Sequence, residues 1–334
     1  MQTITKERGL LKAIIPVAGS GSRLSPITDS KPKALVEVAG APVLEHIIEN
    51  LLKSQIDELV LIVGVMKEQM TDWAMENYGD KILLSFVTQD EPLGLGHAIF
   101  QADAYLSNDE VLISIGDEIF SRDFSVMIDE IRSNSRFDAL VGTMIVTNPS
   151  HYGMVEIGND GLVTRMVEKP KSWDGNLALA GAYYVKRGFD LKRALSELIS
   201  KGSDGREYQI TDALQIMVEK GHKVGTFSVG EGYDCGRPES LLKSNYRMLA
   251  KRHYIDESAI IENSEIIEPC FIGKNARIIN STIGPYVSIG ERVEVKDSKV
   301  SQSIIEQDTM IDGKDVSFMI FSGDVSVKTP DITS

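Results

Sequence analysis

The residues best suited to chemistry lie in a glycine-rich stretch near the N-terminus. Residues 11–17 are apolar except for Lys12 and include the β-branched Ile14, Ile15 and Val17, as in a short buried strand, and residues 19–22 read Gly-Ser-Gly-Ser. Glycines at a strand end let the backbone approach a ligand closely and point N–H groups at it. Arg23, Lys31 and Lys33 follow, and fixed cations beside such a turn favour an anionic ligand, most simply a phosphate.

The familiar phosphate-binding loops do not match this stretch. The chain has no G-x-x-x-x-G-K-[ST] segment, and the dinucleotide fingerprint requires a third glycine and a helix that begins at once. Pro26 and Pro32 instead keep the chain extended, because proline disfavours helix at the residue before it. The plain alternative is a surface turn that happens to carry basic residues. The grouping of glycines, prolines and cations behind one strand favours the phosphate site.

The composition is that of an acidic globular protein. The 334 residues suffice for one large domain and a small one, with 42% hydrophobic residues and a net charge of −14. A nucleic-acid binder needs a basic face, so we expect no nucleic-acid partner. A local cluster of Arg and Lys in an acidic chain favours a small anionic ligand.

The sequence carries no recognisable targeting or membrane signal. No apolar run reaches the roughly 18 residues of a membrane span, and the N-terminal residues lack a signal-peptide cleavage pattern. The two cysteines, Cys235 and Cys270, form no metal or redox motif. We therefore expect a cytoplasmic protein without a membrane partner.

Strand-like and helix-like patterns alternate through the first part of the chain, which predicts parallel βαβ units and an α/β fold. Ligands of such sheets bind beyond the carboxyl ends of the strands. Arg23, Gln89 and Asp117 each follow a predicted strand, so we expect them to converge at one edge. The predicted strands are 58–63, 82–87 and 111–115, and the predicted helices are 42–52, 67–77 and 95–106.

The middle of the chain predicts a β-hairpin, because residues 152–157 and 162–167 alternate around the turn Asn159-Asp160-Gly161. Further strands are predicted at 138–146, 177–185 and 223–229, and helices at 189–200, 209–220 and 238–251.

From residue 255 onwards, aliphatic residues recur every six positions, which is typical of a parallel β-helix built from hexapeptide repeats. About eighteen residues per coil would give roughly three coils, a prism suited to packing or to homo-oligomer formation. The segment from residue 324 is expected to be frayed. The repeating positions are Ile260, Ile266, Ile272 and Ile278 and, after a slip of one residue, Ile283, Ile289 and Val295.

Three further segments are weak signals when each is taken alone. GDEIF places Asp117 and Glu118 after a strand, VEKP places Glu168 and Lys169 after the hairpin, and YDCG contains Asp234. A strand-end Asp is usually a cap, a Glu-Lys pair is usually a solvated face, and Asp-x-Gly is usually a turn.

Together with the opening stretch, these segments closely resemble the sugar-1-phosphate nucleotidyltransferase family. The motifs that carry the resemblance are GSGSRLSPIT, KPKALVEVAGAP, QDEPLGLGHAI, HYGMVEIGNDGLVTRMVEKP, ITDALQIMVEKG and YDCGRPESLLKSN. They occur in order over nearly the whole chain. The pattern is most similar to the glucose-1-phosphate thymidylyltransferase group, in its longer form with a C-terminal left-handed β-helix.

The resemblance implies a Rossmann-like mixed, mainly parallel sheet flanked by helices, the nucleotide-diphospho-sugar transferase fold, followed by a short left-handed parallel β-helix. We expect a catalytic domain at 1–253, a hexapeptide-repeat domain at 254–323 and a tail at 324–334.

The resemblance also implies a reaction, in which a hexose 1-phosphate attacks the α-phosphorus of a nucleoside triphosphate to give an NDP-sugar and pyrophosphate. dTTP and glucose 1-phosphate are the first expectation. YDCG also resembles the uridylyltransferases, so UTP with glucose or N-acetylglucosamine 1-phosphate stays open. A non-catalytic subunit that binds nucleotide sugars is the alternative of another class. Retention of Arg23, Lys33, Asp117 and Asp234 argues against it.

By motif position, the expected catalytic residues are Arg23, Lys33, Asp117 and Asp234, and the two aspartates would hold Mg²⁺. The expected nucleotide-binding residues are Ala18, Gly19, Ser20, Gly21, Ser22, Arg23, Gln89 and Gly94. The expected sugar-phosphate-binding residues are Tyr152, Gly153, Glu168, Lys169 and Gly181.

Four residues depart from the pattern or lie beside it. Arg206 stands one step from the arginine of many relatives, and Glu118 replaces a common Asn. His97 is expected to pack on its helix, and Cys235 to be buried and inert. Acyl transfer on the β-helix is disfavoured, because the last histidine of the chain precedes the repeat.

Overall fold

The computed structural model describes residues 9–203 and 205–332. The chain divides into two compact units that are each assembled from separated segments. The first unit comprises residues up to Gly19, Ile47–Gly116 and Phe120–Gly232, and the second comprises Ser20–His46, Asp117–Ile119 and the residues from Tyr233 onwards.

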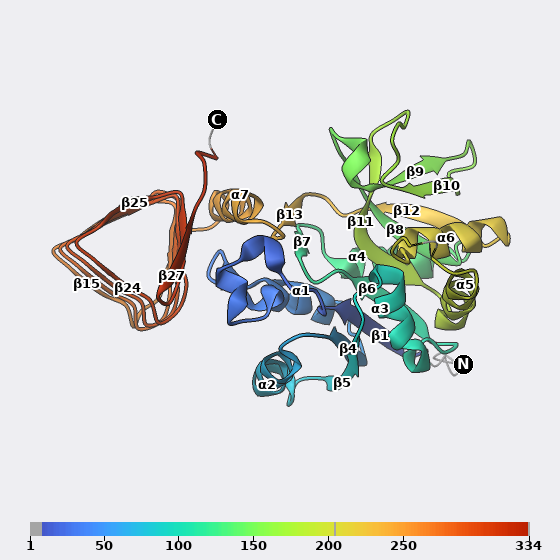
Figure 1. The fold of residues 1–334 in the computed structure, drawn as a ribbon, viewed down its shortest axis with the longest axis horizontal. Helices are drawn as coiled ribbons and strands as arrows, with labels where there is room; N and C mark the ends of the chain where they lie inside the picture. The colour runs from blue at the N-terminus through green and yellow to red at the C-terminus, as the bar shows by residue number, and fades with distance from the viewer. Residues whose placement is uncertain (1–8, 204, 333–334) are drawn as a thin grey trace, which may run out of the picture. The chain divides into compact units, whose positions relative to one another are not determined.

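The first unit is built on a nine-stranded mixed sheet with the path β10-β9-β11-β6-β1-β4-β5, in which β8 pairs with β11 and β12 (Figure 1). The β6-β1-β4-β5 part is parallel, and β11 runs antiparallel to β6. The strands are β1 (Leu11–Pro16), β4 (Glu58–Val63), β5 (Leu83–Thr88), β6 (Glu110–Ser114), β8 (Ala139–Ile145), β9 (Gly153–Ile157), β10 (Val163–Glu168), β11 (Leu177–Val185) and β12 (Val224–Ser228).

Helices connect these strands, as the alternating pattern predicts. Ile14, Val60 and Ile113 of the parallel strands are fully buried in one cluster with Ile99 of α3 and Leu191 of α5. No helix among the described residues is long and apolar enough to span a membrane. The helices are α1 (Val43–Leu52), α2 (Lys67–Tyr78), α3 (Leu95–Gln101), η4 (Asp103–Tyr105), α4 (Phe124–Ser133), η5 (Pro149–His151), α5 (Gly188–Ser200) and α6 (Ile210–Glu219).

The second unit combines the basic segment that follows β1 with a C-terminal parallel β-helix. Its shorter elements are η1 (Ser22–Leu24), η2 (Ile27–Asp29), η3 (Lys33–Leu35), β2 (Glu37–Val38), β3 (Ala41–Pro42), β7 (Glu118–Phe120), β13 (Gly232–Asp234) and α7 (Pro238–Leu249). The parallel ladders β15-β18-β21-β24 and β16-β19-β22-β25, and the ladder from β14 to β26, form the three faces of the coils in Figure 1.

The β-helix strands begin with β14 (Tyr254–Ile255), β15 (Ile260–Glu262), β16 (Glu265–Ile266), β17 (Cys270–Ile272), β18 (Arg277–Ile279), β19 (Thr282–Ile283) and β20 (Val287–Ile289). They continue with β21 (Glu294–Lys296), β22 (Lys299–Ser301), β23 (Ile304–Ile305), β24 (Met310–Asp312), β25 (Asp315–Ser317), β26 (Met319–Ser322) and β27 (Val325–Lys328).

The coils are slightly shorter and more numerous than the hexapeptide count predicts. Ile261 pairs with Ile278 and Ile278 with Val295, so these coils advance 17 residues, and two of the faces have four rungs. Ile260, the first of the repeating positions, is 42% exposed, because Ile261 takes the inward position above Ile278. The parallel stacking agrees with the predicted left-handed β-helix.

The end of the chain differs from the expected frayed tail. β27 pairs antiparallel with β26 over Val325–Lys328. Gly323 adopts a φ of 57°, which lets the chain turn back tightly at this point. The exposed edge of the last coil is therefore covered by the chain itself.

Candidate functional site

The glycine-rich stretch after β1 forms a tight turn that packs on Lys33. Ala18 and Gly19 are the last residues of the first segment of the first unit, and residues 20–22 are the first residues of the second unit. Gly21 has a φ of 70°, and a Cβ at this position would lie 2.9 Å from Lys33 Cβ. The Thr28 hydroxyl donates to the Gly21 carbonyl at 2.8 Å. The turn therefore requires glycine and sets the place of the Lys33 stem.

The two cations of this stretch differ in environment. Arg23, on η1, is exposed, and no described residue forms an ion pair with it, so its guanidinium can meet an anionic ligand. Lys33, on η3, has a side chain only 14% exposed, and its Nζ lies 2.5 Å from Asp117 Oδ2.

Asp117 directly precedes β7 and Asp234 ends β13, and the two lie side by side because the Cys235 N–H donates to the Asp117 carbonyl at 2.9 Å. The Asp234 carboxylate accepts the Gly236 N–H at 2.7 Å. A Cβ added to Gly236 would lie 2.9 Å from Asp234 Oδ1, 3.4 Å from Lys33 Nζ and 3.6 Å from Asp117 Oδ2. Three charged side chains from distant parts of the sequence thus converge on one point.

Nearby titratable groups respond to these carboxylates. Burial, together with the charges of Asp117 and Asp234, raises the pKa of Glu118 well above its usual range. Burial and the same carboxylates raise the pKa of the Cys235 thiol well above its usual value. Cys235 is 2% exposed, which confirms its predicted burial, and a raised pKa disfavours thiolate chemistry.

The donor set at this point fits a magnesium ion. Asp117 and Asp234 offer carboxylate oxygens around the space beside Gly236. No cluster of three or more His, Cys, Asp or Glu suited to a metal occurs in the described part of the chain. Mg²⁺ typically takes one or two carboxylates and completes its shell with phosphate oxygens and water, so the pair is sufficient.

Gln89 and Gly94, the predicted base contacts, lie together in the first unit. The Gln89 amide donates to the Gly94 carbonyl at 3.3 Å and lies 3.1 Å from His97 Nδ1. The Gln101 amide lies 3.0 Å from His97 Nε2. His97 is half-buried on its helix, as expected. Its ring also fixes the position of the Gln89 amide through their hydrogen bond.

The GLG segment around Gly94 is packed against backbone from residues 207–209. Gly94 has a φ of 107°, and a Cβ there would lie 2.6 Å from the Tyr208 carbonyl. The Gly96 N–H donates to the same carbonyl at 2.7 Å. Both glycines are needed for this close approach.

The hairpin residues expected to hold the sugar are grouped around Glu168. Glu168 pairs with Gly153 across β9 and β10, and its Oε2 accepts the Thr211 hydroxyl at 2.6 Å. A Cβ at Gly153 would lie 2.9 Å from Glu168 Oε2. The Lys169 N–H donates to the Tyr152 carbonyl at 3.0 Å, which turns Lys169 out of the strand at a φ of 42°.

Gly181 and Arg206 occupy separate positions near this hairpin and helix α6. Gly181 has a φ of 72°, and its carbonyl accepts the Ile115 N–H at 2.9 Å at the end of β6. Arg206 is exposed. Burial and the charge of Glu168 raise the pKa of Asp212 above its usual value, and the charge of Arg206 opposes this shift in part.

The structure therefore brings the predicted residues together in three groups: Lys33 with Asp117 and Asp234, Gln89 with Gly94, and residues 152–153 with 168–169. The motif analysis did not single out Thr211 or Gln101. Thr211 lies in the ITDAL motif at the start of α6, and its contact with Glu168, 43 positions earlier, is seen only in the folded chain.

Comparisons with known proteins identify the family of the chain. Residues 12–251 match the nucleotidyl transferase family. The glucose-1-phosphate thymidylyltransferase of Streptomyces antibioticus is 29% identical over 91% of this chain and 89% of its own length. The bifunctional protein GlmU of Methanococcus maripaludis is 32% identical over 78% of this chain, which spans only 62% of that relative.

Solved structures give the same result. A crystal structure of a UDP-glucose pyrophosphorylase complexed with UDP-glucose is 25% identical, with a TM-score of 0.63, over 73% of this chain and 100% of that chain. In agreement with its motifs, which resemble those of the sugar-1-phosphate nucleotidyltransferases, the chain belongs to the nucleotidyl transferase family.

Proposed function

We propose that this protein transfers a nucleotidyl group from a nucleoside triphosphate to a hexose 1-phosphate, releasing pyrophosphate, with dTTP and glucose 1-phosphate as its first substrates. The observation that carries the proposal is the convergence of Lys33, Asp117 and Asp234 beside Gly236. A cation and two carboxylates at one point suit phosphoryl-type transfer, which depends on positioning and charge neutralisation more than on a covalent nucleophile.

The glycine-rich segment at residues 18–23 binds the triphosphate in this proposal. Backbone groups of residues 18–22 line the phosphates, and the exposed Arg23 binds the β- and γ-phosphates and the departing pyrophosphate with its rigid fork of donors. Lys33 donates to the α-phosphate side. Its charge is already directed at Asp117, so the free protein keeps the ammonium in place before substrate arrives.

Asp117 and Asp234 are the proposed magnesium ligands. Bound Mg²⁺ supplies polarisation of the α-phosphate and screening of its charge from the attacking anion. The Gly236 N–H fixes one oxygen of Asp234, and the Lys33 ammonium fixes one oxygen of Asp117, so the remaining lone pairs of both carboxylates are oriented.

Base and sugar are assigned to the first unit. We infer that Gln89 and Gly94 contact the base. Glu168, which is acceptor-only when ionised, binds sugar hydroxyls together with Tyr152, Gly153 and Gly181, and Lys169 binds the sugar phosphate. Thr211 adds to this group, because its hydroxyl already occupies one Glu168 oxygen at 2.6 Å.

UTP is the alternative nucleotide, favoured by the similarity to UDP-glucose pyrophosphorylase. Thymine and uracil differ by one methyl, which an apolar pocket discriminates by only about 1–3 kcal/mol. For the whole chain we propose a catalytic domain at 1–253, a β-helix domain at 254–323, a cytoplasmic location and a homo-oligomer.

The test is pyrophosphate release with Mg²⁺ across a matrix of five triphosphates (dTTP, UTP, GTP, CTP and ATP) and three acceptors, the 1-phosphates of glucose, N-acetylglucosamine and mannose. One pair should give clearly fastest turnover. Asp117→Ala should lower that turnover by about 10²-fold or more, as expected when a charge-stabilising group is lost. Asp312→Ala, an exposed β-helix residue, is the matched control and should leave it unchanged.

Two outcomes would count against the proposal. Turnover with none of the pairs, combined with calorimetric binding of an NDP-sugar, would favour the non-catalytic binding subunit. Near-normal activity of Asp117→Ala would remove Asp117 from the site.

A further inference from the structure

A buried carboxylate of the β-helix holds the segment that carries Lys33. Glu306 follows β23, and its side chain is 1% exposed. Its Oε2 lies 2.5 Å from Lys31 Nζ, and its Oε1 accepts the Glu37 N–H at 2.8 Å. Both oxygens of one side chain are thus engaged by a segment that lies some 270 residues earlier in the sequence.

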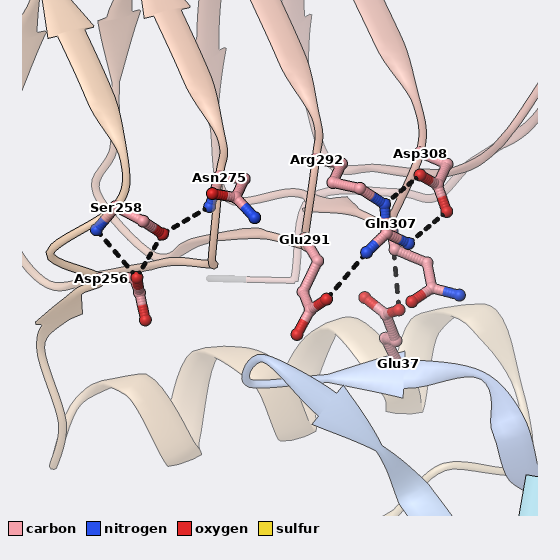
Figure 2. A network of polar contacts seen from close by, with 8 residues as sticks. All are labelled: Glu37, Asp256, Ser258, Asn275, Glu291, Arg292, Gln307 and Asp308. Atoms are coloured by element: carbon pink, nitrogen blue, oxygen red, sulfur yellow. Dashed lines mark hydrogen bonds and ion pairs between the residues drawn. The ribbon is translucent and has the colours of Figure 1, made fainter. Parts of the chain in front are cut away.

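The contact is reciprocal. Figure 2 shows the Glu37 side chain directed at the β-helix, where its Oε1 accepts the Gln307 N–H at 3.4 Å. The β-helix has a glycine at the place where this side chain passes, because a Cβ at Gly290 would lie 2.8 Å from Glu37 Oε2. Three side chains (Lys31, Glu37 and Glu306) and two backbone N–H groups therefore join residues 31–37 to residues 306–307.

The joint between residues 31–37 and residues 306–307 contains more negative than positive charge. Two buried carboxyls, Glu37 and Glu306, face one ammonium, Lys31, and Glu291 is a further acidic neighbour. A buried ion pair is seldom more stable than a well-packed apolar pair of similar volume, whereas removal of one partner is strongly destabilising. Such a pair is better explained by the geometry that it imposes than by a gain in stability.

The geometry imposed here is that of η3. Lys31 lies two residues before Lys33 and Glu37 four residues after it, so both ends of this short helix are held by Glu306. Lys33 cannot shift freely between these ends, and its stem also packs on Gly21. The Lys33 ammonium is thereby held on Asp117.

We propose that Glu306 is a positioning residue for nucleotidyl transfer, acting through Lys31 and the Glu37 backbone on the segment that carries Lys33. The inference rests on the proposed function, since it takes Lys33 as a catalytic residue. The β-helix then has a part in the reaction as well as in packing.

The test uses the full-length protein and the substrate pair that turns over fastest. Glu306→Gln keeps the acceptor for the Glu37 N–H and removes the charge that binds Lys31. The double variant Lys31→Met/Glu306→Gln removes the ion pair without leaving a half-buried ammonium unpaired. It therefore remains informative if the single variant folds poorly. In both, kcat should fall at least about tenfold, because small displacements of a catalytic group lower the rate strongly.

The KM values should separate positioning from general damage. We expect the KM values for both substrates to stay within about twofold, since the other binding groups are unchanged. The matched control is Arg292→Gln, which breaks exposed ion pairs with Asp308 (2.7 Å) and Glu291 (2.9 Å) in the β-helix and leaves Lys31, Glu37 and Glu306 in place (Figure 2). It should leave kcat and both KM values unchanged.

A kcat within twofold of wild type in the folded double variant would overturn the inference. Lys33→Ala, measured in the same assay, distinguishes failure of the Glu306 inference from failure of the proposed function. Loss of activity in Lys33→Ala with normal kcat in the double variant rejects only the role of Glu306, whereas normal activity in Lys33→Ala rejects the proposed function of the segment.

Discussion

At the scale of single residues, Arg23 and Lys33 have the same charge and opposite structural roles. Arg23 is exposed, and no residue within 9–203 or 205–332 pairs with it, while Lys33 is largely enclosed and neutralises Asp117. An exposed side chain without an ion pair contributes little to folding. Substitution of Arg23 should therefore separate catalysis from stability.

Arg23→Ala should lower turnover by about 10²–10³-fold, because one donor to the developing charge on pyrophosphate is lost. The free energy of unfolding should change by no more than about 0.5 kcal/mol, as for other surface substitutions. Pyrophosphate release and urea denaturation give the two values. Full activity in this variant would mean that the phosphates bind elsewhere.

Gly21→Ala should destabilise the fold by about 1–2 kcal/mol, since a residue with a Cβ is disfavoured at a φ of 70° and would collide with Lys33 Cβ. The measurement is urea denaturation of both variants. Gly19→Ala is the control, because a Cβ there meets nothing within 4 Å, and its stability should stay near wild type. Equal losses in the two variants would contradict the packing of Gly21 on Lys33.

At the scale of elements, the sugar-binding hairpin depends on a helix that follows it in the chain. Glu168 ends β10, and the hydroxyl that holds it belongs to the first turn of α6. Thr211 is 2% exposed, so the donor end of this hydrogen bond is buried. Helix α6 therefore sets the direction of the Glu168 carboxylate, which the strand alone leaves free to rotate.

Thr211→Val keeps the shape of the side chain and removes that donor. The KM for the sugar phosphate should rise about tenfold, the loss expected for a hydrogen bond to a charged group, and the KM for the triphosphate should not change. Steady-state kinetics measure both. The control is Thr164→Val, because Thr164 is an exposed residue on β10, the strand that carries Glu168. This variant should alter neither KM. A rise in both KM values for Thr211→Val would indicate general disruption.

At the scale of the whole molecule, the joint between residues 31–37 and the β-helix should make stability depend on pH. Burial, with the charge of Glu306, raises the pKa of Glu37 from 4.5 to about 7. The folded state therefore binds more protons than the unfolded state between these values. The contribution of Glu37 to stability is complete below pH 4.5 and is lost as the pH rises towards 7.

The free energy of unfolding should include a component from Glu37 that falls by about 3 kcal/mol at most between pH 4.5 and 7, since each unit of pKa shift corresponds to about 1.4 kcal/mol. Urea denaturation across this range, compared with Glu37→Gln, isolates the component. In the variant the component should be absent. Parallel pH profiles in the two proteins would show that Glu37 does not titrate in this window.

The local elements of this protein could be read from its sequence. Strands β4 and β11 have the bounds predicted for them, because an uninterrupted apolar run between turn residues is a local pattern. The longer predicted helix at 95–106 instead ends at Gln101 and is followed by a 3₁₀ turn at Asp103–Tyr105. The motifs also singled out Lys33, Asp117 and Asp234, whose catalytic roles stay predictions.

Only the tertiary structure decided which distant side chains meet. The register between coils determines that Ile261, and not Ile260, points into the β-helix. The pairing of β27 depends on the unpaired edge of β26. The bond from Lys31 to Glu306 spans 275 positions and leaves no periodic trace in either segment. Sequence patterns report which residues share a local face, whereas the packing of complete elements determines which faces come together.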